Sequence, residues 1–374
     1  MTGLSSSDRG ILRRCAPEAE KAGRLHPEVL TLIYERQWFR MMVPRRYGGL
    51  ALSLPEVVRL EEAISREDGS AGWTVTLCSG AGWFAGFFGD GAPAALFSDV
   101  ELCIAGSGMA AGRADMVPGG YRISGKWGYA SGAKHATAFT ANCTVWSDGR
   151  QLLTEGGGPV MRPFLFLKEE VRVLDDWHAV GLVATGSHGF EVDGLEIPAS
   201  REFEIAAAAA TDDDPLYRYP FLPLAEATLA ANCSGMVLHF MECCSDVFSE
   251  RIGRGQLSDE ASGEMLGMLE KARDDMAEKR REFYSALDLS WAAVGRGGLA
   301  AMGCGSHATV EPEAFLRVSR ASHDLAAGAR QWADLLYPYA GLGAARVDSE
   351  INRVWRDLHT AGQHPLLVFR RDGR

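Results

Sequence analysis

The stretch Gly119-Gly120-Tyr121-Arg122-Ile123-Ser124-Gly125-Lys126-Trp127-Gly128-Tyr129-Ala130-Ser131-Gly132 decides the fold of this chain. Its first half alternates apolar and polar side chains, which is the pattern of a half-buried β-strand. The second half places two aromatics, Trp127 and Tyr129, close to Ser131 and Gly132. A flat heteroaromatic ligand needs an apolar or aromatic surface for its face and hydrogen-bonding groups for its edge. Tyr129 and Ser131, two residues apart, are predicted to share one face of the strand and to provide both.

Three zones of different composition surround this stretch. Residues 1–105 have apolar residues at helical spacing and predict helices at 55–64 and 71–88. The zone 106–205 is rich in glycine, valine and threonine and predicts a compact β-barrel or sandwich, with strands at 121–124, 137–146, 164–167, 171–174 and 189–197. The zone 206–374 predicts a helical bundle, with helices at 224–249, 258–294, 312–336 and 346–364. The predicted fold class is therefore α+β, with an N-terminal helical domain, a central β domain and a C-terminal bundle.

The composition excludes several classes of function. The chain has 374 residues, a net charge of −11 and no cluster of basic residues, so it lacks the positive patch that nucleic acids and anionic membranes require. No apolar run reaches the roughly 18 residues of a membrane span, and no secretory signal is visible, which predicts a cytoplasmic protein. The eight cysteines include no CxxC pair and are expected to be free thiols. The sequence contains no P-loop, GxGxxG or HExxH motif, and we predict no metal site.

Helices, then short strands, then a helical bundle is the domain order of the acyl-CoA dehydrogenase superfamily, which this chain resembles along nearly its whole length. It is most similar to the branch of flavin-dependent monooxygenases that receive reduced flavin from a separate reductase. The resemblance implies a C-terminal four-helix bundle, a reduced flavin (FMN or FAD) as cofactor and a small-molecule substrate. It also implies a homo-oligomer, since the family is commonly tetrameric.

In this family, the central β segment faces the flavin. The dehydrogenases carry a Trp-x-Thr pair there, and Tyr129 and Ser131 stand in those places. In the monooxygenase branch a Ser-Gly pair lies near the flavin N5 nitrogen, and Ser131-Gly132 is similar. The resemblance therefore implies that the cofactor-binding residues of this segment are Trp127, Tyr129, Ser131 and Gly132, with Trp127 supporting the site from the strand end. It also implies that Ser131 acts in catalysis.

A second segment, 177–189, resembles the W-x-x-x-G-x-x-x-T-G-S turn that lies beside the flavin in this family. Its glycines permit tight backbone turns, and its threonine and serine provide short-range hydrogen-bond donors. The resemblance implies that Thr185, Gly186 and Ser187 contact the cofactor.

A third segment, 352–364, resembles the C-terminal R-x-x-R-D motif and trailing histidines of the monooxygenase branch. There the last histidine points at the N5 and C4a region of the flavin, where it can bond a flavin hydroperoxide or act as the base for a phenolic substrate. An imidazole suits both roles because its pKa lies near working pH. We therefore expect His364 to be catalytic, with His359 second. The charged residues of the motif are expected to form structural ion pairs: Arg353, Arg356 and Asp357.

Two departures from the family pattern bear on the reaction. The α-proton base of a dehydrogenase is a glutamate, but the matching position is Arg346, which cannot act as a base. Many hydroxylases carry a histidine after a G-S-x-x-W pattern; residues 69–73 match that lead-in, but the histidine's place falls near Ala81. Phenol hydroxylation, N-oxygenation and sulfur oxygenation therefore all stay open. The expected substrate pocket consists of Trp73, Ala81, Trp83 and His359.

Three functions are compatible with these residues. In the first, reduced FMN or FAD reacts with O₂ to give a C4a-hydroperoxyflavin, and one oxygen atom passes to a small aromatic or amine-bearing substrate in a pocket that excludes water. The second is an FAD-dependent acyl-CoA dehydrogenase or oxidase with an atypical base. The third is a non-catalytic scaffold. Arg346 and His364 favour the first, a flavin-dependent oxidoreductase of the monooxygenase type.

Overall fold

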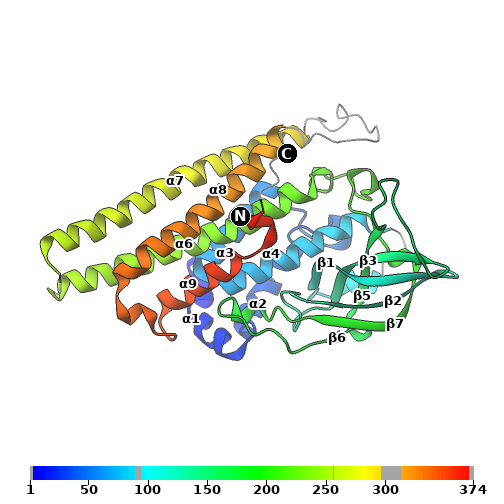
Figure 1. Cartoon of the computed structure of the whole chain (residues 1–374), viewed down its shortest axis with the longest axis horizontal. Helices are drawn as coiled ribbons and strands as arrows, with labels where there is room; N and C mark the ends of the chain where they lie inside the picture. Colours follow the sequence, from blue (N-terminus) through cyan, green and yellow to red (C-terminus); the bar gives the residue numbers. More distant parts are fainter. Residues whose placement is uncertain (1–2, 90–93, 256, 296–312, 370–374) are drawn as a thin grey trace.

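The computed structural model describes residues 3–89, 94–255, 257–295 and 313–369, with helices at both ends of the chain and strands between them (Figure 1). The helices are α1 (Ser6–Ala22), α2 (Pro27–Glu35), α3 (Leu54–Glu67), α4 (Gly69–Trp83), α5 (Ala94–Ser98), α6 (Phe221–Gly253), α7 (Asp259–Gly295), α8 (Glu313–Leu336), α9 (Glu350–Ala361) and α10 (Pro365–Val368). The strands are β1 (Ile104–Val117), β2 (Gly120–Trp127), β3 (Ala138–Ser147), β4 (Arg150–Gln151), β5 (Met161–Leu167), β6 (Arg172–Val173) and β7 (Phe190–Pro198).

Side-chain caps set the starts of the two helices that carry the predicted N-terminal motif. Ser53 precedes α3 and its backbone N–H donates to the Glu56 carboxylate at 2.9 Å, as in a capping box. Asp68 precedes α4, and its side chain accepts a hydrogen bond from the Ser70 N–H at 3.1 Å. α4 is apolar nearly all round, and each of its residues except Leu77 and Gly80 is buried.

Two glycines allow α4 and α6 to pack closely against α3. A Cβ on Gly72 of α4 would lie 2.0 Å from Ser65 Oγ of α3, and a Cβ on Gly235 of α6 would lie 2.4 Å from Glu62 O. Only glycine fits at such distances. The N-terminal and C-terminal helices consequently share one continuous apolar core, although the sequence assigned them to different zones.

The long helices form the other end of the molecule. α7 and α8 lie antiparallel and side by side, and α6 runs beneath them (Figure 1). Among the described residues, α6 is the one helix long and apolar enough to cross a membrane, but 78% of its apolar stretch is buried inside the protein. Burial of that degree is typical of a core helix, so the apolar length of α6 is weak support for a membrane span.

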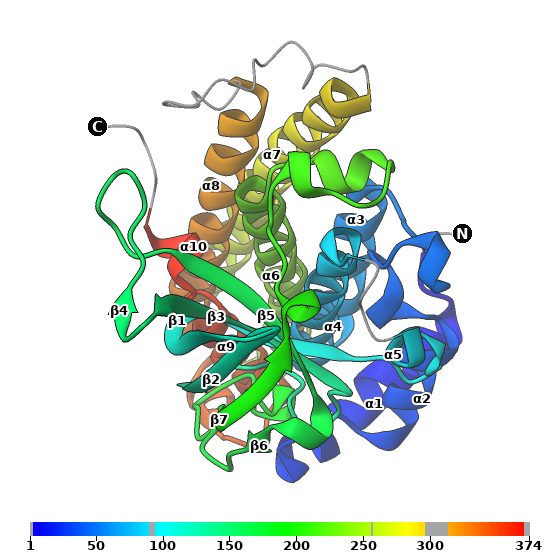
Figure 2. The same cartoon turned by 90° about the vertical axis from the view of Figure 1, so that its right-hand side faces the viewer.

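The strands form one mixed sheet at the opposite end, next to α4 (Figures 1 and 2). The strand order is β4-β3-β1-β2-β7-β6, and β5 also pairs with β3. β1 and β3 are parallel, whereas the other pairs are antiparallel. The register of β1 against β3 shifts between Ser107 and Gly112, which marks a bulge.

The sheet curls around its own aromatic core. Phe139 of β3 packs on Phe190 of β7 with ring centroids 4.7 Å apart, and Tyr121 of β2 packs on Phe164 of β5 at 5.0 Å. An isolated bridge between Phe164 and Glu202 connects β5 to the segment after β7. The predicted barrel or sandwich is therefore better described as one curled, nearly closed mixed sheet.

The predicted strands and long helices are present, with ends shifted by a few residues. The sequence analysis missed β1, because the segment 106–114 consists mainly of glycine, alanine and serine, which have low strand propensity. Pairing with β2 and β3 on both sides makes it a strand nonetheless.

Candidate active site

The segment that opened the sequence analysis leaves the sheet at Trp127, where β2 ends. Tyr129 has a φ of 63° and Gly132 a φ of 79°, so the chain enters the left-handed region twice within four residues. After these turns, Tyr129 is 70% exposed, whereas Ser131 is buried and only 4% exposed. The prediction that Tyr129 and Ser131 share one strand face is therefore wrong, because the strand does not continue past Trp127.

Trp127 lies inside the β core. Its indole is fully buried, donates Nε1–H to Asn142 O at 3.0 Å, and stacks on Phe190 with centroids 5.2 Å apart. Trp127 therefore anchors the end of β2, as the sequence suggested, but it offers no ring face to a ligand.

Backbone hydrogen bonds join this segment to the second predicted motif. The Ala130 N–H donates to His188 O at 3.1 Å, and the Gly132 N–H donates to Thr185 O at 2.8 Å. The two motifs are more than fifty residues apart in sequence, and the structure brings them into direct contact. Gly186, at the tip of the second motif, has a φ of 51° and makes the tight turn that its sequence predicts.

Three buried hydroxyls form a chain across the two motifs. Ser131 Oγ lies 2.8 Å from Ser187 Oγ, and Ser187 Oγ lies 2.6 Å from Thr185 Oγ1. Thr185 in turn donates to Leu182 O at 2.7 Å. None of the three side chains is more than 5% exposed. Three of the predicted cofactor residues are thus linked directly, with Ser131 at the end of the chain.

Asp357 of α9 holds the start of this turn. Its buried carboxyl accepts a hydrogen bond from the Leu182 N–H at 2.5 Å. Burial raises the pKa of Asp357 to about 7; the nearby Asp68 carboxyl raises it further, and the hydrogen bond from Leu182 opposes the rise. The sequence predicted an ion pair for Asp357, but the structure gives it a backbone partner.

Arg356 fixes the same turn from its outer side. It donates to Val180 O at 2.7 Å and forms an ion pair with Glu20 of α1 at 2.6 Å. A Cβ on Gly181 would lie 2.1 Å from Arg356 O, so only glycine fits between the turn and α9. The R-x-x-R-D motif therefore positions the turn that carries the hydroxyls, a role that the sequence analysis did not assign.

His188 shapes the end of the turn. Its buried ring accepts hydrogen bonds at Nδ1 from the backbone N–H groups of Asp176 and Trp177, both at 3.1 Å. Burial lowers the pKa of His188. The neutral imidazole thus acts as a backbone brace.

α4 is the wall that the hydroxyl segment and His364 share. The His364 ring meets Trp73 of α4 edge to face, with centroids 6.0 Å apart. On the next face of α4, the Cys78 thiol donates to Ser131 O at 3.5 Å, and Thr74 Cγ2 would lie 3.3 Å from a Cβ on Gly132. The two predicted catalytic residues, Ser131 and His364, therefore lie against neighbouring faces of one helix.

His364 is held as a neutral imidazole. It caps α10, and its Nδ1 accepts a hydrogen bond from the Leu366 N–H at 3.3 Å. Burial lowers the pKa of His364 to about 4. Because Nδ1 is an acceptor, the ring hydrogen sits on Nε2, which can donate to a ligand at neutral pH.

Two of the residues predicted for the substrate pocket are engaged in helix packing instead. The His359 ring stacks on Trp355, and its Nε2 lies 2.8 Å from Asp334 Oδ1 of α8. Trp83 is fully buried and donates Nε1–H to Leu216 O at 3.0 Å. Both predictions are corrected because these partners hold Trp83 in the core and His359 in a half-buried contact with α8, away from the predicted pocket. Ala81 is 5% exposed.

An apolar strip on α4 is the better candidate for a substrate surface. Leu77, Gly80 and Phe84 follow Trp73 at helical spacing and are half-buried. A Cβ on Gly80 would meet no atom within 4 Å, so the space above this glycine is open, and Phe84 lies directly after the last residue of α4. The helical spacing of these residues can be read from the sequence, but the substrate pocket was predicted around Ala81 instead.

The groups around Ser131 fit a flavin in chemical kind. Tyr129 and the half-buried Trp177 meet edge to face with centroids 6.4 Å apart and offer aromatic surface. A Cβ on Gly128 would meet only Met109 Sδ at 4.0 Å, so the backbone there is open. Aromatic surface beside a buried hydroxyl suits a flat ring with a polar edge.

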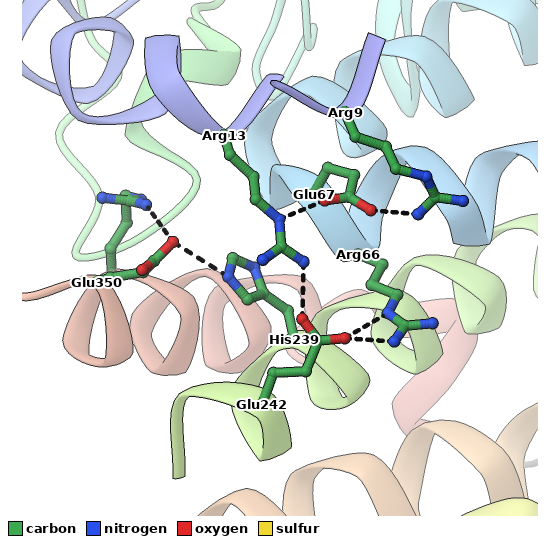
Figure 3. Close-up of polar contacts among 8 residues, drawn as sticks. Arg9, Arg13, Arg66, Glu67, His239, Glu242 and Glu350 are labelled. Carbon is green, nitrogen blue, oxygen red and sulfur yellow. Dashed lines mark hydrogen bonds and ion pairs between the residues drawn. The ribbon is translucent and has the colours of Figure 1, made fainter. Parts of the chain in front are cut away.

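A second polar cluster lies away from this site, where α1 meets α3 and α6 (Figure 3). Glu67 is bonded by both Arg9 and Arg13, and Glu242 is bonded by Arg13 at 2.7 Å and by Arg66 at 2.7 Å. These residues line a cavity of about 310 Å³. Since each guanidinium already has a carboxylate partner, the cluster ties α1 to the helical core.

His239, Cys243 and Glu350 adjoin that cluster and place their ligand atoms within 4.8 Å of one another. Burial raises the pKa of Cys243 to about 12, and Arg353 Nη2 lies 3.7 Å from Glu350. A protonated thiol and an adjacent guanidinium both disfavour a bound cation. The contact between His239 Nε2 and Glu350 Oε1, at 3.2 Å, is therefore interpreted as a hydrogen bond between side chains.

The chain is similar in sequence to several known proteins. The family model for the acyl-CoA dehydrogenase C-terminal domain matches residues 299–369. A pigment production hydroxylase from Rhodococcus sp. is 31% identical over 257 residues, and the match covers 66% of this chain and 64% of that protein, which is less than two thirds of its length. The oxygenase subunit HsaA of a flavin-dependent monooxygenase from Rhodococcus jostii is 26% identical over 367 residues, 94% of this chain and 91% of that protein.

The fold is found in solved structures as well. The crystal structure of 3-HSA hydroxylase from Rhodococcus sp. RHA1 matches with a TM-score of 0.86 at 23% identity, covering 97% of this chain and 92% of that one. Other solved structures with this fold contain FADH₂ or FMN. These structures confirm an acyl-CoA dehydrogenase-like fold of helices and a mixed sheet, whereas the predicted division into three domains stays a prediction.

Proposed function

We propose that this chain, a member of the acyl-CoA dehydrogenase superfamily, is the oxygenase component of a two-component flavin-dependent monooxygenase. It receives reduced FMN or FAD from a separate reductase and uses O₂ to insert one oxygen atom into a small substrate. The relatives support this reaction class, since they are flavin-dependent monooxygenases and one is an FADH₂-dependent oxygenase component.

The observation that carries the proposal is the placement of Ser131 and His364 on neighbouring faces of α4. A flavin supplies the oxygen-activating chemistry when bound, and the hydroxyl and imidazole supply hydrogen bonds to its reactive edge. Both groups are uncharged at neutral pH, and Ser131 and the Trp73 ring beside His364 are buried. Such a dry, uncharged site suits a reaction that loses hydrogen peroxide when water enters.

The apolar strip on α4 supports an aromatic substrate. Leu77 and Phe84 offer apolar contacts on either side of the open space at Gly80. An aromatic ring with one polar substituent, such as a hydroxyl or an amine, fits this surface with its polar group directed toward the His364 Nε2 donor.

Arg346 gives no support to a dehydrogenase. It is 71% exposed and forms a bidentate ion pair with Asp348, with its Nη2 at 2.8 Å from Oδ2. A cation held at the surface cannot remove an α-proton in a buried site.

The remaining features of the proposal rest on the family and on the surface. We propose a homotetramer in the cytoplasm with three parts at 1–105, 106–205 and 206–374. Exposed apolar side chains near the C-terminus support self-association: Leu342 is 90% exposed, Val347 75% and Phe369 70%.

The test is coupled turnover with enzymatically reduced flavin and a panel of phenols, indoles and aromatic amines. We expect product to form in proportion to reduced flavin consumed. Ser131→Ala and His364→Asn should each lower the product yield at least several-fold and raise hydrogen peroxide correspondingly. Because the pKa of His364 is about 4, the wild-type yield should be flat from pH 6 to pH 8 in so far as it depends on this residue.

Asp348→Asn, at the exposed ion pair, is the matched control and should keep the wild-type yield. Tight co-purification of oxidised FAD that is bleached by an acyl-CoA would contradict the proposal. So would unchanged yields in both the Ser131 and the His364 variants.

A further inference from the structure

The hydroxyl chain can form all of its hydrogen bonds in only one donor-to-acceptor direction, which we call its polarity. Ser131, Ser187 and Thr185 have one hydroxyl hydrogen each, and they make three hydrogen bonds in series. The last acceptor is Leu182 O, which is a carbonyl and cannot donate. Thr185 must therefore donate to Leu182, Ser187 to Thr185, and Ser131 to Ser187.

The acceptor end of the chain is firmly held. The Leu182 N–H donates to Asp357, and the same carbonyl that accepts from Thr185 also accepts from Trp177 Nε1–H at 3.1 Å. Leu182 has a φ of 52°, which turns its carbonyl toward these donors. A reversed chain would lose the bond from Thr185, and the loss of one buried hydrogen bond disfavours it by about tenfold.

This polarity decides what Ser131 can offer to a ligand. Its single hydrogen is engaged by Ser187, and no donor to Ser131 Oγ is found among the described residues. The only hydrogen-bonding capacity that Ser131 Oγ has left is a lone pair. Ser131 can therefore accept a hydrogen bond from a ligand but cannot donate one. A ring nitrogen that carries a hydrogen can bond to it, whereas a ring nitrogen with only a lone pair is repelled.

We propose that Ser187 and Thr185 are positioning residues that fix Ser131 as an acceptor and thereby select the reduced flavin over the oxidised one. The inference rests on the proposed function, which places the flavin N5 edge beside Ser131. N5 carries a hydrogen in the reduced ring and only a lone pair in the oxidised ring. The chain thus discriminates between redox states through the direction of neutral hydrogen bonds, without a charge.

The proposal is tested by anaerobic equilibrium binding of reduced and oxidised FMN and FAD to the full-length protein. The wild type should bind the reduced form at least tenfold more tightly. In Ser187→Ala, the Ser131 hydroxyl loses its acceptor and can donate to a ligand. In Thr185→Val, Ser187 loses its acceptor and can donate to Ser131, which again leaves the Ser131 hydrogen free for a ligand. Both variants should lower the ratio of the two Kd values by about tenfold, mainly because the oxidised flavin binds more tightly.

Thr185→Ser keeps the hydroxyl and is the matched control, so it should keep the wild-type ratio. Thermal unfolding shows whether each variant is folded. If Ser187→Ala does not fold, Thr185→Val still tests the proposal, because valine has nearly the same shape as threonine. A gain in oxidised-flavin affinity is not expected from general structural damage, which weakens both forms.

The outcomes separate this proposal from the function on which it rests. An unchanged ratio in folded Ser187→Ala and Thr185→Val overturns the positioning role, while coupled turnover still tests the oxygenase. Equal wild-type affinity for both forms also overturns it. Failure of the wild type to bind either form overturns both proposals.

Discussion

Two polar networks in this protein join distant segments by different physics. The hydroxyl chain of Ser131, Ser187 and Thr185 is neutral and buried. The network around Glu67 and Glu242 is charged, and its arginines are 40–44% exposed (Figure 3). Guanidinium and carboxylate attract each other from many directions, whereas hydroxyls in series have a defined donor at each step.

The difference separates stability from specificity. Half-exposed ion pairs are screened by solvent and can be rearranged at little cost. A buried hydroxyl chain cannot be rearranged without leaving a partner unpaired. The charged network therefore holds α1 on the core. The neutral chain can instead decide whether the site offers a ligand a hydrogen-bond donor or an acceptor.

The largest effect is expected where the neutral chain meets α9. Gly181→Ala places a Cβ 2.1 Å from Arg356 O, and neither backbone can move without releasing the turn that carries Thr185 and Ser187. We expect a loss of about 3 kcal/mol in the free energy of unfolding, together with loss of flavin binding. Denaturant unfolding and flavin titration measure the two effects.

The control for this variant is Gly263→Ala in α7, where a Cβ would meet nothing within 4 Å. It should stabilise the protein by about 0.5–1 kcal/mol, because alanine is the better helix former. A Gly181→Ala protein as stable as the wild type would show that the turn does not depend on α9.

A smaller, pH-dependent effect is expected at Asp357. Its pKa of about 7 in the folded state lies above the ordinary value near 3.9, so the folded protein binds more protons between these values. Stability from this group is present at low pH and is lost as pH rises through 7. Asp357→Asn, which can still accept from Leu182, should therefore gain about 2 kcal/mol over the wild type between pH 5 and pH 8.

The measurement is denaturant unfolding of both proteins at the two pH values. Asp348→Asn is the comparison, since ion pairing with Arg346 lowers the pKa of that exposed carboxyl and no gain with pH is expected. Parallel pH profiles for Asp357→Asn and the wild type would mean that Asp357 is ionised throughout.

The smallest effect is expected in the charged network. Arg9→Met removes one partner of Glu67 but keeps the apolar stem, and Arg13 still neutralises the carboxylate. We expect a loss of about 0.5 kcal/mol at low salt that disappears at 1 M salt. A loss of several kcal/mol that salt does not change would place this network with the buried chain instead.

Both site motifs could be predicted from the sequence because each is local. Ser131-Gly132 and Thr185-Gly186-Ser187 are short patterns whose residue types already show their hydrogen-bonding capacity. The errors arose where a side chain's direction depends on distant parts of the chain. Tyr129 adopts a positive φ that non-glycine residues rarely adopt, and the ring of His359 is held by Asp334 of another helix.

The sequence by itself determined the order of the long helices and of most strands, because apolar periodicity is a local property of the chain. Through its family resemblance it also predicted which residues contact a flavin. Only the tertiary structure decided the direction of the hydroxyl chain and the neutral state of His364. Direction requires that Leu182, held by Asp357, lie within hydrogen-bonding distance of Thr185. Neutrality requires burial against Trp73 of α4, and both depend on segments that meet only after folding.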